Sequence, residues 1–283
     1  MTATPCLQSA EKRAASSLSF RAASDRGRSI MKSALVVGVM MLSEAHSQAT
    51  DVDAAIVFAV DASGSIDAAA ADLQREGHAE AIRAPEVIAA IDRGNFGCIA
   101  IAYVEWASTG QTRTVMPWTS ICGREDAQGA AAIIRREGNK GNSCRRSCGT
   151  SISFAIDFGA LLLDGYVGHA SSRIIDISAN GTNNDGLPVE LSRLDAVGSG
   201  ITINAIAVPT FLKGERQNLV DYLAENVIGG AGAFAVEPYT TNGYAAALRR
   251  KMTIEISMLG NLTSQSLMPL PASGSGAWSE TGR

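Results

Sequence analysis

An uninterrupted apolar run, Ala54–Val60 (AAIVFAV), constrains the fold of this chain more than any other feature of its sequence. Aspartates border the run on both sides, Asp53 before it and Asp61 after it. A strand with one face in water alternates polar and apolar residues, whereas a strand that is covered on both faces is apolar throughout. The run therefore predicts a central strand of a parallel sheet, packed between two layers of helices.

The sequence that follows alternates between helical and strand periodicity. Residues 67–92 carry apolar side chains at helical spacing, and Pro85 predicts a break or the first turn of a second helix. Cys98–Trp106 is a second buried strand by its pattern, and Gln111–Trp118 alternates like a half-exposed edge strand, joined to it as a hairpin through residues 108–110. Further helices are expected at about 124–137, 151–164, 186–199, 215–226 and 240–255, and further strands at about 172–178, 201–208 and 233–236. This alternation predicts an α/β fold with a doubly wound, mostly parallel sheet and one antiparallel edge strand.

The N-terminal segment has the pattern of a secretory signal. Met31 and Lys32 precede an apolar stretch, Ala34–Leu42, and small residues follow at Ser47 and Ala49, the positions that a signal peptidase inspects. The apolar stretch is shorter than the roughly 20 residues that a membrane-spanning helix needs, so no stable membrane anchor is expected. We expect translation to start at Met31, cleavage after Ala49, and a periplasmic or secreted protein. If residues 1–30 are instead a long basic n-region, the destination is the same.

The chain accordingly divides into an N-terminal extension with its signal peptide (1–49), one domain (50–257) and a disordered tail rich in Ser, Gly and Pro (258–283). The formal net charge is −4 for the whole chain. It becomes −7 without residues 1–49, because that segment holds six of the 24 Lys and Arg and three of the 28 Asp and Glu. A domain this acidic is not expected to bind nucleic acid.

An exported protein can form disulfides. The cysteines outside the predicted signal segment are Cys98, Cys122, Cys144 and Cys148. Cys98 lies in the second apolar run and is expected to be a buried thiol, while a bridge is expected to join Cys122 to Cys144 or Cys144 to Cys148. A zinc site is disfavoured because three residues separate Cys144 from Cys148, where zinc sites commonly have two.

An oxygen-rich loop follows the first strand. Asp61, Ser63 and Ser65 alternate along the loop, and Gly64 allows it to turn, so one carboxylate and two hydroxyls can point at a single ion. Ligands of open α/β sheets bind at the carboxyl ends of the strands, where this loop begins. An all-oxygen set suits Mg²⁺ or Mn²⁺ better than zinc. The metal-free alternative is that Asp61 caps a helix and the serines are turn residues.

The segment VFAVDASGSID resembles the opening of a von Willebrand factor type A (VWA) domain, and the resemblance extends over about Asp51–Ser257. The metal-ion-dependent adhesion site (MIDAS) of that family starts with Asp-x-Ser-x-Ser after the first strand. It also uses a Thr from a later loop and an Asp at the end of the fourth strand. Thr150, in the segment CGTSI, matches the Thr, whereas Asn180 stands where the family has Asp. The ligands that the resemblance implies are Asp61, Ser63, Ser65, Thr150 and Asn180.

Asn180 changes what the resemblance implies about the metal. An amide oxygen still orients a metal-bound water, but one negative charge is lost, so Mg²⁺ or Mn²⁺ is expected to bind weakly. Asp176 and Asp185 are the candidates that compensate for the lost charge. The segments YVEWA, NN after the fourth strand, and VIGGAGAF resemble a branch of exported proteobacterial proteins in this superfamily, of unknown function.

The resemblance implies an adhesion-type protein-binding module and not an enzyme, in which an acidic side chain of a partner protein completes the metal's coordination. One alternative is a metal-dependent phosphoryl-transfer hydrolase with Asp61 as nucleophile, as in haloacid-dehalogenase-like phosphatases. Those enzymes need a second Asp at the position of Ser63. Another alternative is a structural protein whose metal site has decayed through Asn180. The sequence contains neither a Gly-x-Ser-x-Gly elbow nor a nucleotide-binding P-loop.

Overall fold

The computed structural model describes residues 50–141, 144, 148–209, 216–238, 240 and 243–266, apart from the side chains of 216–218 and 259–266. The chain divides into two units, Met1–His46 and Ser47–Arg283, and every described residue belongs to the second. The predicted signal peptide and residues 267–283 of the predicted tail lie outside the described residues. Among the residues described, no helix is both long enough and apolar enough to cross a membrane.

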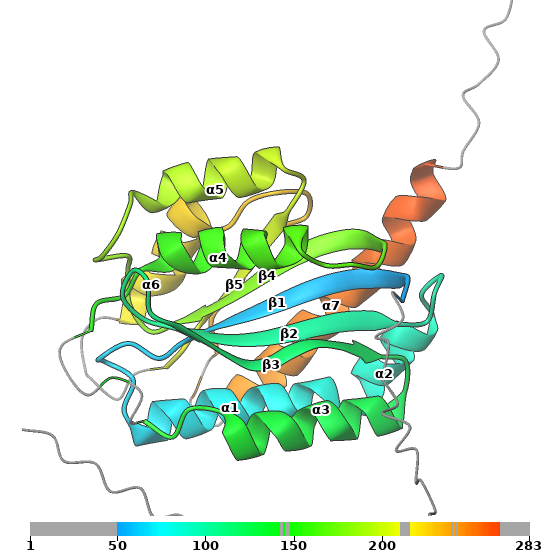
Figure 1. Ribbon diagram of the computed structural model, residues 1–283, viewed down its shortest axis with the longest axis horizontal. Helices are drawn as coiled ribbons and strands as arrows, with labels where there is room; N and C mark the ends of the chain where they lie inside the picture. The colour runs from blue at the N-terminus through cyan, green and yellow to red at the C-terminus, as the bar shows by residue number, and fades with distance from the viewer. Residues whose placement is uncertain are drawn as a thin grey trace, which may run out of the picture. The chain divides into compact units, whose positions relative to one another are not determined.

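A six-stranded sheet in the order β3-β2-β1-β4-β5-β6 forms the centre of the second unit (Figure 1). The strands are β1 (Val52–Asp61), β2 (Ile99–Trp106), β3 (Thr112–Ile121), β4 (Ala170–Ala179), β5 (Thr202–Ala207) and β6 (Ala235–Val236). All neighbouring strands are parallel except β2 and β3, which pair antiparallel as the predicted hairpin. The predicted α/β class, with its mostly parallel sheet and one antiparallel edge strand, is confirmed.

Strand β1 is buried along its whole length, as its apolar sequence predicts. It lies between β2 and β4, and its side chains alternate between two separate cores. Ile56 and Phe58 belong to the core on one face of the sheet, whereas Val57 and Ala59 belong to the core on the other. Because both faces of the sheet are covered, β1 is held firmly in place. The loop after Asp61 therefore starts from a fixed point at the carboxyl end of this strand.

Helices cover both faces of the sheet (Figure 1). One layer holds α1 (Ala68–Ile82), α2 (Pro85–Asp92), α3 (Arg124–Glu137) and α7 (Tyr244–Ser266); the other holds α4 (Ile152–Asp164), α5 (Val189–Gly198), α6 (Arg216–Tyr222) and the π-helix η1 (Leu223–Val227). The side chain of Asp67 caps α1 by accepting a hydrogen bond from the Ala70 N–H, and Pro85 occupies the first turn of α2. Both helix starts are therefore fixed by local chemistry.

Helix α7 reaches Ser266, inside the segment that we predicted as a disordered tail from residue 258. Once a helix is nucleated, each further residue adds a backbone hydrogen bond at little cost. A helix anchored by packing can therefore extend beyond the residues for which apolar periodicity predicts it.

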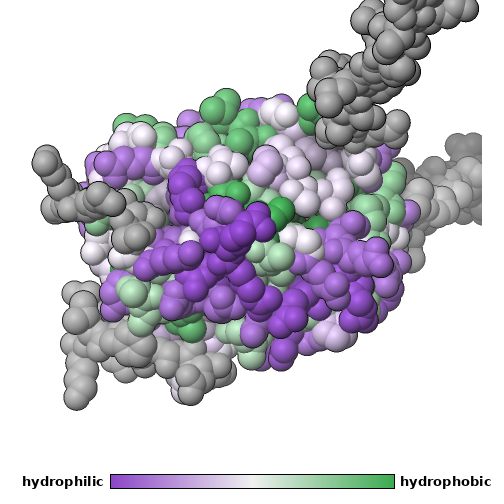
Figure 2. Space-filling model, turned by 60° about the horizontal axis from the view of Figure 1, so that its bottom comes forward, coloured by the Kyte–Doolittle hydropathy of each residue, from purple (hydrophilic) through white to green (hydrophobic). Residues whose placement is uncertain are grey.

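The outer face of α1 and α3 is mostly hydrophilic (Figure 2). Ion pairs tie its side chains together, among them Arg75 with Asp72 and Arg135 with Glu76. Partly exposed pairs of this kind contribute little stability individually. The charged side chains that form these pairs keep this face of the domain polar.

The described part of the chain contains two disulfides, Cys98–Cys122 and Cys144–Cys148. The second is one of the two bridges expected from the sequence. The expectation that Cys98 is a free buried thiol is wrong, and so is a Cys122–Cys144 bridge. The antiparallel register pairs Ile99 with Ile121, which brings the cysteines just outside the two strand ends opposite each other.

Candidate metal centre

Asp61 ends β1 with a fully buried side chain. Its Oδ1 accepts a hydrogen bond from the Ser63 N–H at 2.7 Å, and its Oδ2 accepts one from the Asn180 N–H at 3.3 Å. Burial raises the pKa of Asp61 to about 6, while the hydrogen bonds from Ser63 and Asn180 act in the opposite direction. The carboxyl is therefore mostly ionised at neutral pH and supplies a negative charge at the end of the central strand.

The two serine hydroxyls of the loop lie beside each other and beside Asn180. Ser63 Oγ is 3.2 Å from Ser65 Oγ, and the Ser65 hydroxyl donates to Asn180 Oδ1 at 2.7 Å. The amide of Asn180 also donates from Nδ2 to the Ser65 carbonyl oxygen at 3.1 Å. Asn180, at the end of β4, therefore holds Ser65 through both its oxygen and its nitrogen.

Thr150 is buried in the segment that leads into α4. This segment lies against the serine loop, because the Gly64 N–H donates to the Cys148 carbonyl at 3.2 Å. The Thr150 N–H in turn donates to Asn184 Oδ1 at 2.8 Å. The structure thus brings the Thr150 segment to the site, although none of the described hydrogen bonds joins its hydroxyl to the other four side chains.

The donor chemistry of these residues fits a hard divalent cation. All the candidate ligand atoms are oxygens, and adjacent ligands of an octahedral Mg²⁺ shell lie about 3 Å apart, as its 2.0–2.1 Å bonds require. The spacings of 3.2 Å between the serine oxygens and 2.7 Å between Ser65 and Asn180 are close to this value. Only Asp61 contributes a charge, so the set matches a weak site. Within the described part of the chain, no group of three His, Cys, Asp or Glu side chains is placed to hold a metal.

Residues 51–260 match a family described as "Protein of unknown function (DUF1194)". The chain belongs to this family. No curated protein matches the sequence.

Comparison with solved structures finds several that are similar to this DUF1194 domain. Proximal thread matrix protein 1 (PTMP1) from the mussel byssus is 16% identical, with a TM-score of 0.54 over 74% of this chain and 49% of that chain. A further PTMP1 structure, described as having a zinc-occupied MIDAS motif, gives a TM-score of 0.53 at 16% identity over 74% and 48% of the two chains. The pilus adhesin SpaC from Lactobacillus rhamnosus GG is 12% identical, with a TM-score of 0.50 over 75% and 31%. A von Willebrand factor type A protein from Catenulispora acidiphila is 14% identical, with a TM-score of 0.48 over 73% and 43%.

The DUF1194 chain thus spans half or less of the length of these proteins. At such low identities the likeness shows the fold alone. With the strand order of the sheet, it confirms the predicted VWA-type fold.

Two residues proposed to compensate for Asn180 have different surroundings. Asp176 is fully buried, and its Oδ2 lies 2.6 Å from Nζ of Lys251 on α7, so the expectation that it serves the metal site is wrong. Its position on β4 places the Asp176 side chain on the face of the sheet that α7 covers. Asp185 accepts a hydrogen bond from the Thr109 N–H, and hydrogen bonds from Ser108 and Thr109 lower its pKa. Asp185 therefore lies at the rim of the site as an ionised group.

The two asparagines after β4 were not predicted from the sequence to have a role at the site. Asn184 accepts from the Thr150 N–H and donates its own N–H to the Thr150 carbonyl at 2.9 Å. Asn183 Oδ1 accepts from the Ser153 N–H in the first turn of α4 at 3.1 Å. This pair joins the loop after β4 to the start of α4. The sequence feature that could have predicted this role is the doublet NN, since Asn side chains commonly accept hydrogen bonds from N–H groups in loops and at helix starts.

Proposed function

We propose that this DUF1194 domain is an exported, adhesion-type protein-binding module with a divalent-cation site at the carboxyl ends of β1 and β4. The observation that carries the proposal is the convergence of Asp61, Ser63, Ser65 and Asn180, with oxygen spacings close to those of an octahedral shell. A zinc-occupied MIDAS motif in PTMP1 and the adhesin SpaC, which share the fold, support it.

Each residue has a distinct task in the proposed site. Asp61 supplies the negative charge, Ser63, Ser65 and Thr150 supply hydroxyl oxygens, and Asn180 orients the site through its amide. The hydroxyl of Ser65 can keep donating to Asn180 Oδ1 while its lone pairs face an ion. Mg²⁺ or Mn²⁺, when bound, supplies the attraction for an acidic side chain of a partner protein. The single carboxylate makes the ion weakly held.

The melting temperature of the full chain in Mg²⁺ and in EDTA tests the metal site. A ligand near its Kd stabilises by about 0.4 kcal/mol and one at 100 times its Kd by about 2.7 kcal/mol, so the shift reports affinity. We expect a small shift for the natural sequence at millimolar Mg²⁺, a larger one for Asn180→Asp, which restores the charge, and none for Asp61→Ala.

Matched controls are Asn95→Asp and Asp195→Ala, which make the same changes at exposed positions and should leave the shift unchanged. If Asn180→Asp and Asp61→Ala both behave like these controls, residues 61–65 form a metal-free turn ahead of the Asp67 cap of α1, and the adhesion-site proposal fails.

Partner capture from an envelope extract, in Mg²⁺ against EDTA, tests the binding function. We expect a protein that is retained only with Mg²⁺ and is lost with Asp61→Ala. Turnover of a phosphate monoester that disappears in Asp61→Ala would instead establish the hydrolase alternative. A chain that responds neither to metal nor to phosphate esters would be a structural protein with a decayed site.

A further inference from the structure

A buried cluster of charges lies between α7 and the sheet. Nζ of Lys251 is 2.6 Å from Asp176 Oδ2 and 2.5 Å from Glu255 Oε1, and all three side chains are essentially excluded from solvent. Asn204 Nδ2 donates to the same Glu255 oxygen at 2.6 Å. Two carboxylates thus face one ammonium. When both are ionised the cluster carries an excess negative charge, which is costly in a buried position.

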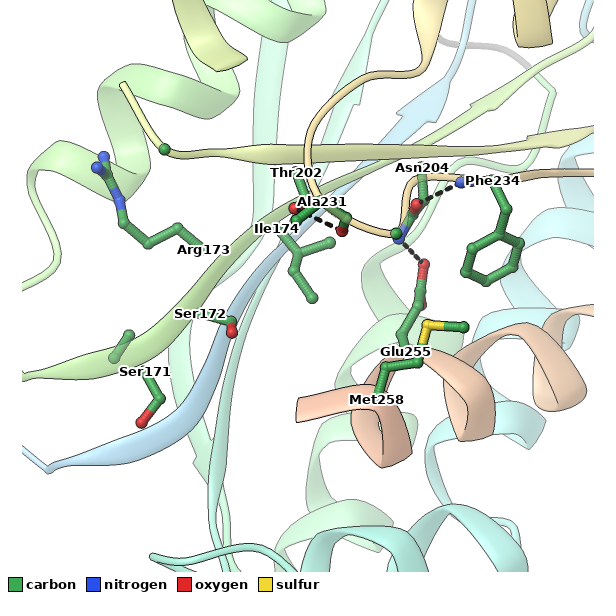
Figure 3. A pocket seen from close by; sticks show the side chains of 13 residues that line it. Ser171, Ser172, Arg173, Ile174, Thr202, Asn204, Ala231, Phe234, Glu255 and Met258 are labelled. Carbon is green, nitrogen blue, oxygen red and sulfur yellow. Dashed lines mark hydrogen bonds between the residues drawn. The ribbon is translucent and has the colours of Figure 1, made fainter. Parts of the chain in front are cut away.

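A cavity of about 220 Å³ opens next to this cluster, at the amino ends of β4 and β5 (Figure 3). It lies at the edge of the sheet opposite to Asp61, because β1, β4 and β5 run parallel. Ile174, Phe234 and Met258 give it apolar walls, and Ser172 adds a hydroxyl. The cavity is therefore a pocket with an apolar body and few polar groups, as small-ligand sites commonly are.

Glu255 links the cluster to the cavity. Its side chain rises from α7 towards Asn204, beside Met258 (Figure 3), and is 3% exposed. Its Oε1 is engaged by Lys251 and Asn204, but its Oε2 has no hydrogen-bond partner. A buried carboxylate oxygen that lacks a donor is destabilising, so this atom requires a proton or a ligand.

Nearby charges do not supply the missing donor. Arg173 also lines the cavity, but its guanidinium donates to Asp164 and to the Ser199 carbonyl. In Figure 3 it extends away from Glu255. His78 lies in the same core, and burial lowers its pKa to about 4, so it is neutral at neutral pH. The excess charge of the cluster is thus uncompensated by the described groups that surround it.

We propose that this cavity binds a small organic ammonium ion, whose head group donates to Glu255 Oε2 and whose apolar tail lies between Ile174, Phe234 and Met258. The ammonium supplies both the missing hydrogen-bond donor and the missing positive charge. The volume corresponds to that of about seven waters at about 30 Å³ each, which suits a ligand the size of pentylammonium. Anions are excluded by the charge of the cluster.

Calorimetric titration of the full chain at pH 8 with n-pentylammonium and with 1-pentanol tests the proposal. The two ligands have the same apolar chain, but pentylammonium ends in a charged ammonium group and pentanol in a neutral hydroxyl group. We expect pentylammonium to bind at least about tenfold more tightly, because a hydrogen bond between charged groups is worth more than a neutral one. Glu255→Gln keeps the size of the side chain and should remove the preference. Equal affinity of the natural chain for the two ligands, or no binding of pentylammonium, overturns the proposal.

Glu255→Gln also takes a charged partner from Lys251, so a second variant avoids the cluster. Met258, 42% exposed at the edge of the cavity, can be replaced by Trp to fill the space. Leu161→Trp is the matched control on exposed α4, across the sheet (Figure 1). We expect Met258→Trp to weaken pentylammonium binding about tenfold or more with an unchanged circular dichroism spectrum, and Leu161→Trp to have no effect. Natural affinity in Met258→Trp contradicts the site.

The dependence of binding on pH provides an independent readout. Burial raises the pKa of Glu255 to about 7. The titratable groups that face it are Lys251 on α7 and Asp176 on β4, while β5 presents the neutral amide of Asn204. A proton on Glu255 competes with the ammonium, so affinity should fall between pH 8 and pH 6. An affinity that is flat over this range contradicts a carboxylate as the recognition group.

Discussion

At the scale of single residues, Asn180 shows how one amide changes a site. Its oxygen accepts from the Ser65 hydroxyl and its nitrogen donates to the Ser65 carbonyl, so the loop is held without an ion. A carboxylate at this position can accept but cannot donate. The natural residue thus favours an ordered metal-free loop over affinity for a cation.

Asn180→Asp should therefore destabilise the metal-free protein while strengthening its response to metal. In EDTA we expect the free energy of unfolding to fall by about 1–3 kcal/mol, because the Ser65 carbonyl loses its donor and a second charge lies close to Asp61. Urea unfolding in EDTA and in Mg²⁺ measures both effects. Equal stability of the natural chain and the variant in EDTA would show that the amide does not hold the loop.

Lys251 is the residue whose loss should cost the domain most. Replacing it by Met leaves Asp176 and Glu255 buried together without a cation. Removing one partner of a buried ion pair lowers the free energy of unfolding by about 3–5 kcal/mol. Lys140→Met, at an exposed position, should change stability by less than about 0.5 kcal/mol. Urea denaturation of both variants decides the matter, and similar midpoints would contradict a structural role for the buried ion pair.

Glu255 should give the domain a characteristic dependence on pH. Its pKa is raised by burial from 4.5 to about 7, so the folded state binds this proton more tightly than the unfolded state does. The associated stability is fully present below about pH 4.5 and is lost as the pH rises through 7, by up to about 3 kcal/mol. The difference in stability between the natural chain and Glu255→Gln should therefore change between pH 5 and 8. Glu80→Gln, at an exposed position, is the matched control, and an equal change in that variant would contradict burial of Glu255 as the cause.

At the scale of elements, the sequence predicts the parts whose cause is local. The apolar run of β1, the alternation of β3 and the Pro85 start of α2 each reflect one dominant signal, and these elements are found where they were expected. The π-helix η1 and the length of α7 depend on packing, and neither has a signal of its own in the sequence.

The candidate site was predictable only in part, for the same reason. The alternation of Asp61, Ser63 and Ser65 is local, so their grouping could be read from the chain. The two-sided contact of Asn180 with Ser65 joins segments that are distant in sequence, and so does the pairing of Asp176 with Lys251. The spacing of four residues between Lys251 and Glu255 on one helix was the available hint of the buried pair.

The Cys98–Cys122 bridge also follows from the hairpin. It joins the start of β2 to the end of β3 across a separation of 24 residues, whereas the other bridge spans four. In the chain-entropy model these loops correspond to about 3.5 and about 2 kcal/mol. Removing the first pair by Ala substitution should therefore lower the free energy of unfolding more than removing the second. Urea unfolding compares the two double variants, and the reverse order would contradict loop closure as the cause.

At the scale of the whole domain, two sites lie at opposite edges of the parallel sheet, because all the strands that carry them run in the same direction. The candidate metal centre lies at the carboxyl ends of β1 and β4, and the ammonium cavity lies at the amino ends of β4 and β5. The first is built from loop oxygens held in place by Asn180, and the second lies beside the buried charge cluster between α7 and the sheet. Because different residues form them, variants at one site should leave ligand binding at the other intact.

The start of the folded domain bears on the predicted export of the chain. The Tyr166 hydroxyl donates to the Thr50 carbonyl at 2.7 Å, and the His169 N–H donates to Asp51 Oδ1 at 3.3 Å. The Val52 N–H then donates to the His169 carbonyl at 2.8 Å as β1 begins. Cleavage after Ala49 leaves all these contacts in the mature protein, whereas cleavage a few residues later removes them.

We therefore expect that the full chain, expressed in a Gram-negative host, is recovered from the periplasm or the medium with Thr50 as its first residue. A signal peptidase requires a small residue at position 49, so Ala49→Arg should leave the segment attached, while Ala49→Ser should be processed as the natural chain is. N-terminal sequencing and cell fractionation measure the outcome. A cytoplasmic protein that retains residues 1–49 would contradict both the export and the periplasmic setting that the proposed adhesion function needs.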